Sequence, residues 1–279
     1  SLNLASTSSS NPAQRRKGRV FLSAPVNWKN LPAQTCENIS WDSKALAVKM
    51  QQETRIGALI IDSKPIQNAN RETVSDIICE AARKDGLSMF DWNESVHRLQ
   101  QRVAQVAEWH PELEIPDLST EHLLTTARAW LPFYLEEGGK MKTSVTELKK
   151  LNLCEILWNI LPYELQQEID RLAPTHIRVP SGSNIRIDYR LGAEAPVLSV
   201  RLQECFGMTS TPTVDAGRQP LLLELLSPGF KPVQLTQDLA SFWQGTYFEV
   251  RKELKRRYPK HFWPENPLES QAVRGVKRW

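Results

Sequence analysis

Near the carboxy terminus, apolar side chains recur every three or four residues, a spacing typical of an amphipathic helix. The residues that carry this pattern are Leu239, Trp243, Tyr247, Val250, Leu254 and Tyr258. Thr236 or Asp238 can cap the start by accepting a hydrogen bond from a free helical amide, and Pro259 ends the pattern at Tyr258. We therefore predict one long helix over 238–258, buried along its apolar face.

The first part of the chain carries short β-rich runs, each bounded by polar residues. They span 19–26, 38–42, 45–50 and 56–61. Strands this close together favour a small antiparallel sheet or barrel, so we expect a β-rich module over 15–68. The Ser/Thr/Asn-rich residues 1–14 before it are expected to form a flexible leader.

The pattern becomes helical between residues 69 and 174. A first helix from Glu72 is expected to stop at Gly86, and Asn93 and Ser119 can each cap a further helix. Two more starts carry capping boxes, which pair a cap residue with an acidic residue three positions later: Ser144 with Glu147, and Asn152 with Glu155. These signals predict a helical layer.

After Pro174 apolar residues alternate, which indicates strands. Residues 176–179 and 184–189 read as a hairpin around the turn 180–183, with Arg178 and Arg186 on the face opposite the apolar positions. A third strand is expected at 196–200, a loop at 209–217 and a second hairpin at 221–226 and 233–235. We predict an α+β fold: a small β module, a helical layer, then an antiparallel β unit over 175–264 closed by the terminal helix, with a flexible tail at 265–279.

Two blocks of sequence carry a resemblance to a known family. The first block comprises 225–229, 232–239, Phe242-Trp243, 250–254, 257–261 and Trp263-Pro264. The second comprises 172–174, 179–182, 187–189, 196–198, 200–204 and Phe206-Gly207. Together they resemble the carboxy-terminal, non-motor region of the HrpB family, bacterial ATP-dependent helicases of the DEAH/DExH type. The match is specific over about residues 172–264 and looser upstream.

The resemblance implies an accessory region of an ATP-dependent helicase. By position, residues 15–68 would match the OB-like module of such helicases, although a plain meander fits the strand pattern equally. The implied partners are single-stranded or structured RNA, or DNA, and the motor domains of the same polypeptide, in the cytoplasm. ATP and magnesium would belong to the motor domains, so we expect no cofactor in this chain.

Motifs for nucleotide hydrolysis are missing from the chain. The only Gly-Lys pair, Gly139-Lys140, has Tyr134 where a phosphate-binding loop needs its first glycine, and no Asp-Glu dipeptide occurs. The four cysteines form no CxxC pair and the five histidines show no metal-ligand spacing. No apolar run approaches the roughly 20 residues of a membrane span. We therefore predict no catalytic residue, no metal site and no membrane contact.

The net charge is only +3, but positive charge gathers at the end of the predicted terminal helix. The candidate nucleic-acid-binding residues are Arg251, Lys252, Lys255, Arg256, Arg257, Tyr258, Lys260 and His261, with Arg178 and Arg186 as secondary candidates. The cations can contact phosphates, while Tyr258, Phe262 and Trp263 can stack on unpaired bases. The alternatives are a solvated helix face, favoured by the helix dipole, or a docking surface for an acidic protein.

Overall fold

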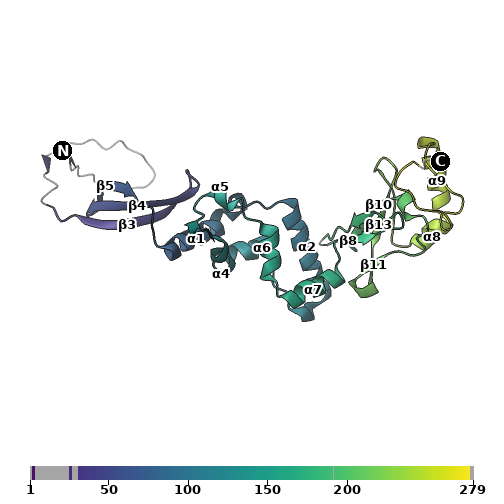
Figure 1. Ribbon diagram of the computed structural model, residues 1–279, viewed down its shortest axis with the longest axis horizontal. Helices are drawn as coiled ribbons and strands as arrows, with labels where there is room; N and C mark the ends of the chain where they lie inside the picture. The colour runs from purple at the N-terminus through teal and green to yellow at the C-terminus, as the bar shows by residue number, and fades with distance from the viewer. Residues whose placement is uncertain (1, 4–24, 27–30, 191, 277–279) are drawn as a thin grey trace, which may run out of the picture.

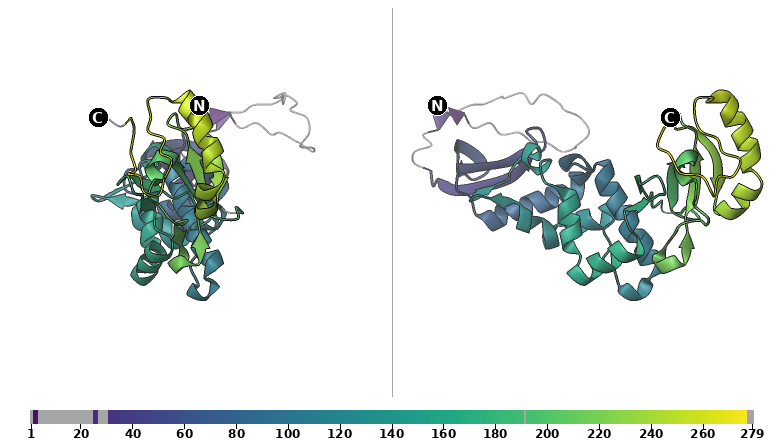
Figure 2. Two further views of the ribbon diagram at one scale, coloured as in Figure 1. Left: turned by 90° about the vertical axis from the view of Figure 1, so that its right-hand side faces the viewer. Right: turned by 45° about the vertical axis from the view of Figure 1, so that its right-hand side comes forward.

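The computed structural model describes residues 2–3, 25–26, 31–190 and 192–276. It is an elongated α+β molecule in which three units follow one another (Figure 1): a β meander, a helical region, and a mixed β/α unit at the carboxy-terminal end. The right-hand view in Figure 2 shows the same order. The predicted α+β class is confirmed.

The meander consists of β3 (Gln34–Asp42), β4 (Ala47–Ile56) and β5 (Leu59–Pro65), paired antiparallel in that order. In addition, β1 (Leu2–Asn3) pairs with β2 (Pro25–Val26), whereas residues 19–24 of the first predicted strand lie outside the described part. Backbone hydrogen bonds from Val48 to Thr143 and from Val145 to Leu46 tie the meander to the helical region. The described strands make a meander, and an OB-like barrel stays a prediction.

The helical region begins with α1 (Arg71–Met89) and α2 (Glu94–Trp109). The shorter elements that follow are η2 (Pro111–Leu113), α3 (Thr120–Thr125), α4 (Ala127–Trp130), η3 (Leu131–Tyr134), β6 (Glu136–Glu137), β7 (Lys140–Met141), α5 (Val145–Leu148), α6 (Leu153–Ile160) and α7 (Tyr163–Leu172). Among the described residues, no helix combines the length and apolar character that crossing a membrane requires.

The predicted helix starts in this region are confirmed. Asn93, Ser119 and Asn152 each accept a hydrogen bond from a backbone amide of the first turn, and Ser144 forms its capping box with Glu147. The predicted stop at Gly86 is wrong, because α1 continues to Met89. Gly86 instead makes room for α3: a Cβ there would lie 2.2 Å from a methyl carbon of Leu124.

The carboxy-terminal unit opens with the predicted hairpin, β8 (His176–Arg178) and β9 (Asn184–Arg186). Its main sheet has the order β10 (Val197–Arg201), β13 (Leu222–Leu226), β14 (Pro232–Thr236). β13 and β14 pair antiparallel as expected, but β10 runs parallel to β13. The sheet is therefore mixed, because the chain crosses back between these strands instead of turning directly.

The crossover contains structure that the sequence did not indicate. It passes through η4 (Leu202–Cys205), β11 (Thr213–Val214), η5 (Asp215–Gly217) and β12 (Gln219–Pro220). β11 pairs antiparallel with β12. The segment 209–217, predicted as a plain loop, thus ends in a small hairpin whose bend is η5.

The single terminal helix is a wrong prediction, because two helices occupy its place. They are α8 (Leu239–Gln244) and α9 (Tyr247–Arg257), separated at Gly245, whose φ of −126° and ψ of −87° are not helical. The predicted ends hold: Asp238 accepts a hydrogen bond from the Ser241 amide, and Tyr258 ends α9 before Pro259. Trp243 and Tyr247, one on each side of the break, both pack against Phe206, with their ring centroids 6.2 and 6.4 Å from that of Phe206.

The last described residues return along the unit, where a flexible tail was predicted. The Gly207 amide donates to the Pro267 carbonyl at 2.9 Å, and the Val273 amide donates to the Gln203 carbonyl at 3.0 Å. Pro267 itself is buried. Residues 265–276 therefore belong to the packed unit, while residues 277–279 lie outside the described part.

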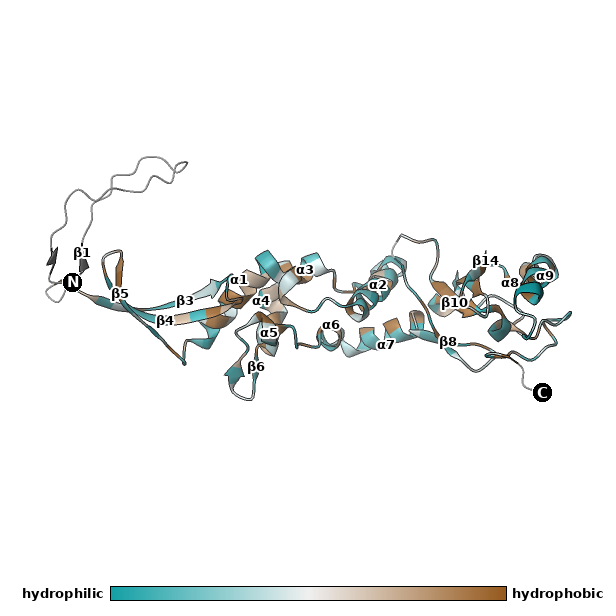
Figure 3. Cartoon of the chain, turned by 90° about the horizontal axis from the view of Figure 1, so that it is seen from above, coloured by the Kyte–Doolittle hydropathy of each residue, from teal (hydrophilic) through white to brown (hydrophobic). Residues whose placement is uncertain are grey.

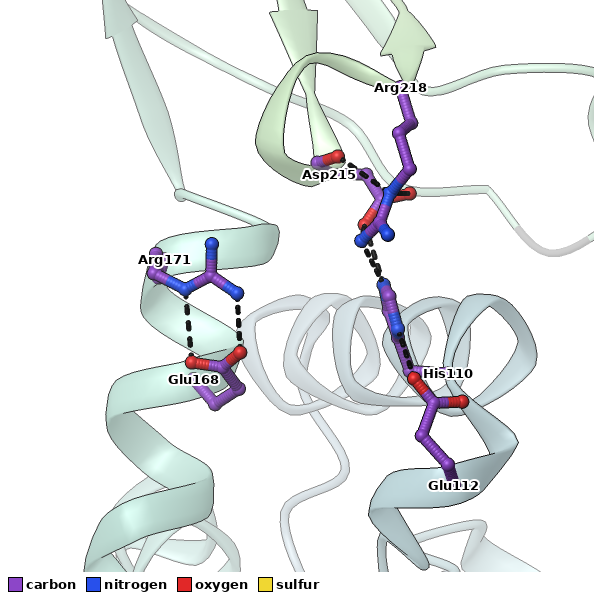
Figure 4. A network of polar contacts seen from close by, with 6 residues as sticks. All are labelled: His110, Glu112, Glu168, Arg171, Asp215 and Arg218. Carbon is purple, nitrogen blue, oxygen red and sulfur yellow. Dashed lines mark hydrogen bonds and ion pairs between the residues drawn. The ribbon is translucent and has the colours of Figure 1, made fainter.

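A polar cluster around the buried His110 and Asp215 joins the helical region to the carboxy-terminal unit (Figure 4). His110, 8% exposed at the end of α2, lies 2.6 Å by Nε2 from Asp215 Oδ1 and 2.7 Å by Nδ1 from Glu112 Oε1. Hydrogen bonds to Asp215 and Glu112 raise the pKa of His110. Arg218 donates to the same Asp215 oxygen at 2.9 Å. Nearby, Arg171 pairs with Glu168 on α7.

Candidate nucleic-acid interface

The core anchors one face of α9 and leaves the other in solvent. Tyr247 and Leu254 are 0% and 1% exposed, and Val250 is half-buried. Most of the other residues of the helix are hydrophilic (Figure 3). Because side chains four residues apart share a helix face, the anchored stripe determines which side chains are presented to solvent.

Five of the predicted cations are exposed on α9 or just beyond it. They are Lys252, Lys255, Arg256, Arg257 and Lys260. Arg257 lies 3.9 Å from Glu253, a loose contact between exposed groups. Within the described residues, the other four make no ion pair with a carboxylate, so their charge is available to a ligand. We call these five residues the α9 basic surface.

Arg251 has a different environment. Its side chain is 20% exposed, its Nε donates to the Trp263 carbonyl at 3.1 Å, and its Nη2 lies 3.5 Å from Glu265. Arg251 therefore holds the segment after α9 against the helix, and its charge is partly committed inside the unit.

His261 also faces inward. It is half-buried, and its Nδ1 lies 3.0 Å from Gln203 Oε1. Burial, together with the nearby Arg201, lowers the pKa of His261. The lowered pKa disfavours a positive charge on this side chain, and its half-buried position sets it apart from the exposed cations.

The three aromatic residues after α9 are engaged in internal contacts. Trp263 is 6% exposed and its Nε1 donates to the Tyr258 carbonyl at 2.9 Å. The Phe262 ring packs 6.4 Å from that of Phe206. The Tyr258 hydroxyl lies 3.4 Å from Ser227 Oγ, and a Cβ on Gly229 would meet it at 2.8 Å. A base-stacking role has no support at Trp263, because no face of its ring is open.

One exposed ring on α9 was missed in the sequence. Phe248 is 48% exposed, and it precedes Lys252 by four positions and Lys255 by seven. That spacing places all three on one helix face. This spacing is present in the sequence, but the prediction for this helix rested on the apolar residues of its opposite face.

The secondary candidates lie elsewhere in the unit. Arg178 and Arg186 are exposed on the β8–β9 hairpin, with Ile177 and Ile185 half-buried on its other face, as the alternation predicted. Figure 1 shows this hairpin beside the helical region, whereas α9 lies toward the far end of the molecule. The structure therefore groups the α9 cations but does not bring Arg178 and Arg186 to them.

The turn of that hairpin is held by internal contacts. The hydroxyls of Ser181 and Ser183 donate to Glu204 Oε1 at 3.1 and 2.6 Å. Glu204 is 3% exposed and lies 3.4 Å from Arg201. These contacts support a structural role for the turn and for Glu204.

Comparison with known proteins identifies the family. Residues 130–267 match a family model described as the ATP-dependent helicase C-terminal domain of HrpB. The chain is 35% identical over 246 residues to the ATP-dependent RNA helicase HrpB of Escherichia coli (strain K12); the match covers 88% of this chain and 30% of that protein. The chain thus spans about a third of the length of this relative.

Two crystal structures agree with the sequence match. That of the E. coli DExH-box NTPase HrpB gives a TM-score of 0.70 at 34% identity, covering 95% of this chain and 33% of the other. That of the E. coli DEAH/RHA helicase HrpB gives a TM-score of 0.62 at 33% identity, covering 88% and 30%. The family model, the sequence identity and the shared fold agree with one another, and the chain belongs to the HrpB-type helicases, in which it corresponds to a carboxy-terminal region.

Proposed function

We propose that this chain is the accessory region of an HrpB-type helicase that binds RNA, or DNA, through the α9 basic surface and packs against the motor domains of the same polypeptide. The observation that carries the proposal is the α9 basic surface itself: five exposed cations on and just after a helix whose other face is fixed in the core. The relative in E. coli carries the name of an ATP-dependent RNA helicase. Hydrolysis of ATP belongs, in this proposal, to the motor domains.

The physical basis is attraction between the cations and phosphates. Each phosphate that binds Lys or Arg releases condensed counterions, so affinity falls with salt, with a slope of about 0.7 per contact for a single strand. Such contacts carry little sequence preference. The helix dipole, negative at the end of α9, stabilises the cations but does not itself attract phosphate.

The experiment is fluorescence anisotropy of the chain with labelled single-stranded RNA and DNA, at low and at physiological salt. The test variant is Arg256→Glu/Lys260→Glu. The matched control is Lys44→Glu/Lys149→Glu, which reverses two exposed cations in the meander and the helical region. We expect salt-sensitive binding that the test variant weakens by at least about tenfold, equivalent to about 1.4 kcal/mol, and that the control leaves nearly unchanged.

The second candidate function is protein docking without nucleic-acid contact. The exposed Phe248 among the cations favours it, because a face that is both apolar and basic also suits an acidic protein surface. In that case the chain ignores RNA at low salt. Charge reversal on α9 then weakens the association of the motor domains with this region instead.

A further inference from the structure

A pocket of about 480 Å³ opens where the helical region meets the β8–β9 hairpin. We call it the junction pocket, and its main walls are Arg98, Arg102, Trp158, His176, Arg186 and Tyr189. The lining residues come from α2, from α6 and its start, and from the β8–β9 hairpin and the residues beside it. Its volume falls within the roughly 300–1,000 Å³ typical of small-ligand sites.

The floor of the pocket is rigid and aromatic. Arg102 is 6% exposed; its Nε donates to the Ala173 carbonyl at 2.6 Å, it pairs with Asp170, and its guanidinium lies 5.3 Å from the centre of the Trp158 ring. Tyr189 is 4% exposed and its hydroxyl donates to the Pro174 carbonyl at 2.7 Å. These contacts orient the flat groups that line the pocket before any ligand arrives.

The rim carries available positive charge. Arg186 is exposed and, within the described residues, makes no ion pair with a carboxylate. His176 is its cross-strand neighbour, and Arg98 approaches from α2, where it pairs with Glu94. Two carboxylates also line the pocket. Asp188 accepts from the cationic Arg190 at 2.7 Å, whereas Glu155 accepts from the neutral amide of Asn152 at 3.0 Å and makes no ion pair within the described residues.

An aromatic and guanidinium floor under a cationic rim matches the two parts of a nucleotide. Bases stack on aromatic rings and on guanidinium planes, and phosphates bind Arg. We propose that the junction pocket binds one nucleoside monophosphate unit, with the base against Trp158 and the phosphate at Arg186 and Arg98. The unit is either a free nucleotide or one residue of a single strand. This site goes beyond the proposed function, because it uses none of the α9 residues.

Cys154 provides a probe inside the pocket. It lines the pocket, is half-buried, and its Sγ lies 3.8 Å from the Ser95 carbonyl. Burial raises the pKa of this thiol, so its alkylation is slow enough to follow. Of the other cysteines, Cys36 is exposed while Cys79 and Cys205 are buried. Cys36→Ser therefore leaves Cys154 as the accessible thiol.

The experiment measures the alkylation rate of Cys154 by N-ethylmaleimide in the Cys36→Ser chain, with adenosine 5′-monophosphate or with a 5′-phosphorylated hexa-adenylate RNA. Because a bound base covers the pocket, the rate should fall about tenfold when the ligand exceeds its dissociation constant about tenfold. Protection by the RNA alone assigns the pocket to a strand, whereas protection by the mononucleotide as well assigns it to nucleotides in general. Both results support the site.

Variants distinguish the site from nonspecific protection and from the α9 basic surface. Arg98→Ala/Arg186→Ala, which changes two solvent-accessible side chains, should abolish protection, and Arg186→Lys should keep part of it. Arg256→Glu/Lys260→Glu should leave protection by the mononucleotide intact. The assay therefore tests the junction pocket independently of whether the α9 basic surface binds RNA. The proposal is overturned if neither ligand slows alkylation, or if both ligands protect the Arg98→Ala/Arg186→Ala chain as well as the original one. Poly-glutamate is a third ligand in the same assay. Protection by poly-glutamate alone would also overturn the proposal, because it would assign the pocket to an acidic protein.

Discussion

The α9 basic surface and the junction pocket both combine cations with nearby aromatic residues, but they do so in opposite ways. On α9 the cations are exposed, while of their aromatic neighbours in sequence Trp263 is buried and Tyr258 is half-buried. In the junction pocket Arg102 lies over Trp158, although these residues are far apart in sequence. The comparison teaches that proximity along the chain does not indicate which rings and cations can meet one ligand.

The difference follows from the energetics of burying rings. A Trp or Tyr side chain removes a large apolar area from water when it packs, and a buried ring still needs a partner for its polar atom. The segment after α9 satisfies both needs at once, since Trp263 packs inward and donates to the Tyr258 carbonyl. The Lys and Arg side chains of the α9 basic surface gain nothing comparable and stay in solvent.

The largest expected effect comes from Trp263→Ala. Because the ring is 6% exposed, its loss should reduce the free energy of unfolding by about 3–5 kcal/mol. Urea denaturation followed by circular dichroism measures it. RNA affinity, compared under conditions where both chains are folded, should hardly change. A stable variant with weakened RNA binding would show instead that the ring stacks on a base.

The cluster at the joint should make stability depend on pH. The pKa of His110 is raised in the folded chain, so its stabilising contribution is complete below its unfolded pKa, about 6.5, and is lost as pH rises through the folded value. Glu112, Asp215 and Arg218 face it directly, and the Glu168–Arg171 pair lies close by. We expect His110→Gln to cost about 1–3 kcal/mol below pH 6, because the buried carboxylate of Asp215 loses a charged hydrogen bond.

Thermal unfolding between pH 5 and 8 measures this dependence. The stability difference between the original chain and His110→Gln should shrink as pH rises. His97→Gln, at an exposed position of α2, is the control and should leave the pH profile unchanged. A constant difference across the range would mean that His110 is not charged in the folded chain.

Asp215 gives stability the opposite pH dependence to His110, at acidic pH. Burial alone would raise the pKa of its carboxyl, but the hydrogen bonds from Arg218 and His110 outweigh burial and lower it. Its contribution is therefore present above the unfolded pKa and is lost as pH falls through the folded value. Asp215→Asn should reduce the loss of stability on acidification below pH 4, as measured by thermal unfolding extended into that acidic range.

Phe248→Ala is a smaller, more selective test of α9. The ring is exposed, so stability should change by less than about 0.5 kcal/mol. If the ring stacks on a base beside Lys252 and Lys255, affinity for single-stranded RNA should fall by about 1 kcal/mol, the lower end for a stacked base. Anisotropy at fixed salt measures it, with Leu59→Ala in the meander as an exposed apolar control. If the original chain and Phe248→Ala bind RNA equally well, α9 contributes to RNA binding through phosphate contacts and not through this ring.

Arg257→Ala should have the smallest effect. Its contact with Glu253 is long and exposed, so the urea midpoint should stay unchanged. The slope of log affinity against log salt for single-stranded RNA should fall by about 0.7, the value for one lost phosphate contact. Lys149→Ala, an exposed cation of the helical region, should leave that slope unaltered. If the salt slope is unaltered in Arg257→Ala as well, Arg257 does not contact an RNA phosphate.

The local sequence determined much of the secondary structure. Caps such as Asn93 and Asn152 satisfy helix amides within a few residues, and the alternation of Ile177, Arg178, Ile185 and Arg186 determines which face of the hairpin is exposed. The periodic apolar stripe likewise predicted that Lys252 and Arg256 face solvent. These features depend only on neighbours along the chain, which is why they could be read from it.

Only the tertiary structure decided how these pieces meet. The parallel pairing of β10 with β13 and the packing of Trp243 and Tyr247 against Phe206 each join residues that are distant in sequence, and the break at Gly245 interrupts a periodic pattern that predicted one helix. The contact of His110 with Asp215 and the walls of the junction pocket likewise join segments from different units. The physical reason is that burial rewards any complementary surfaces that come together, whatever their separation in sequence, whereas periodicity and capping report only on residues a few positions apart.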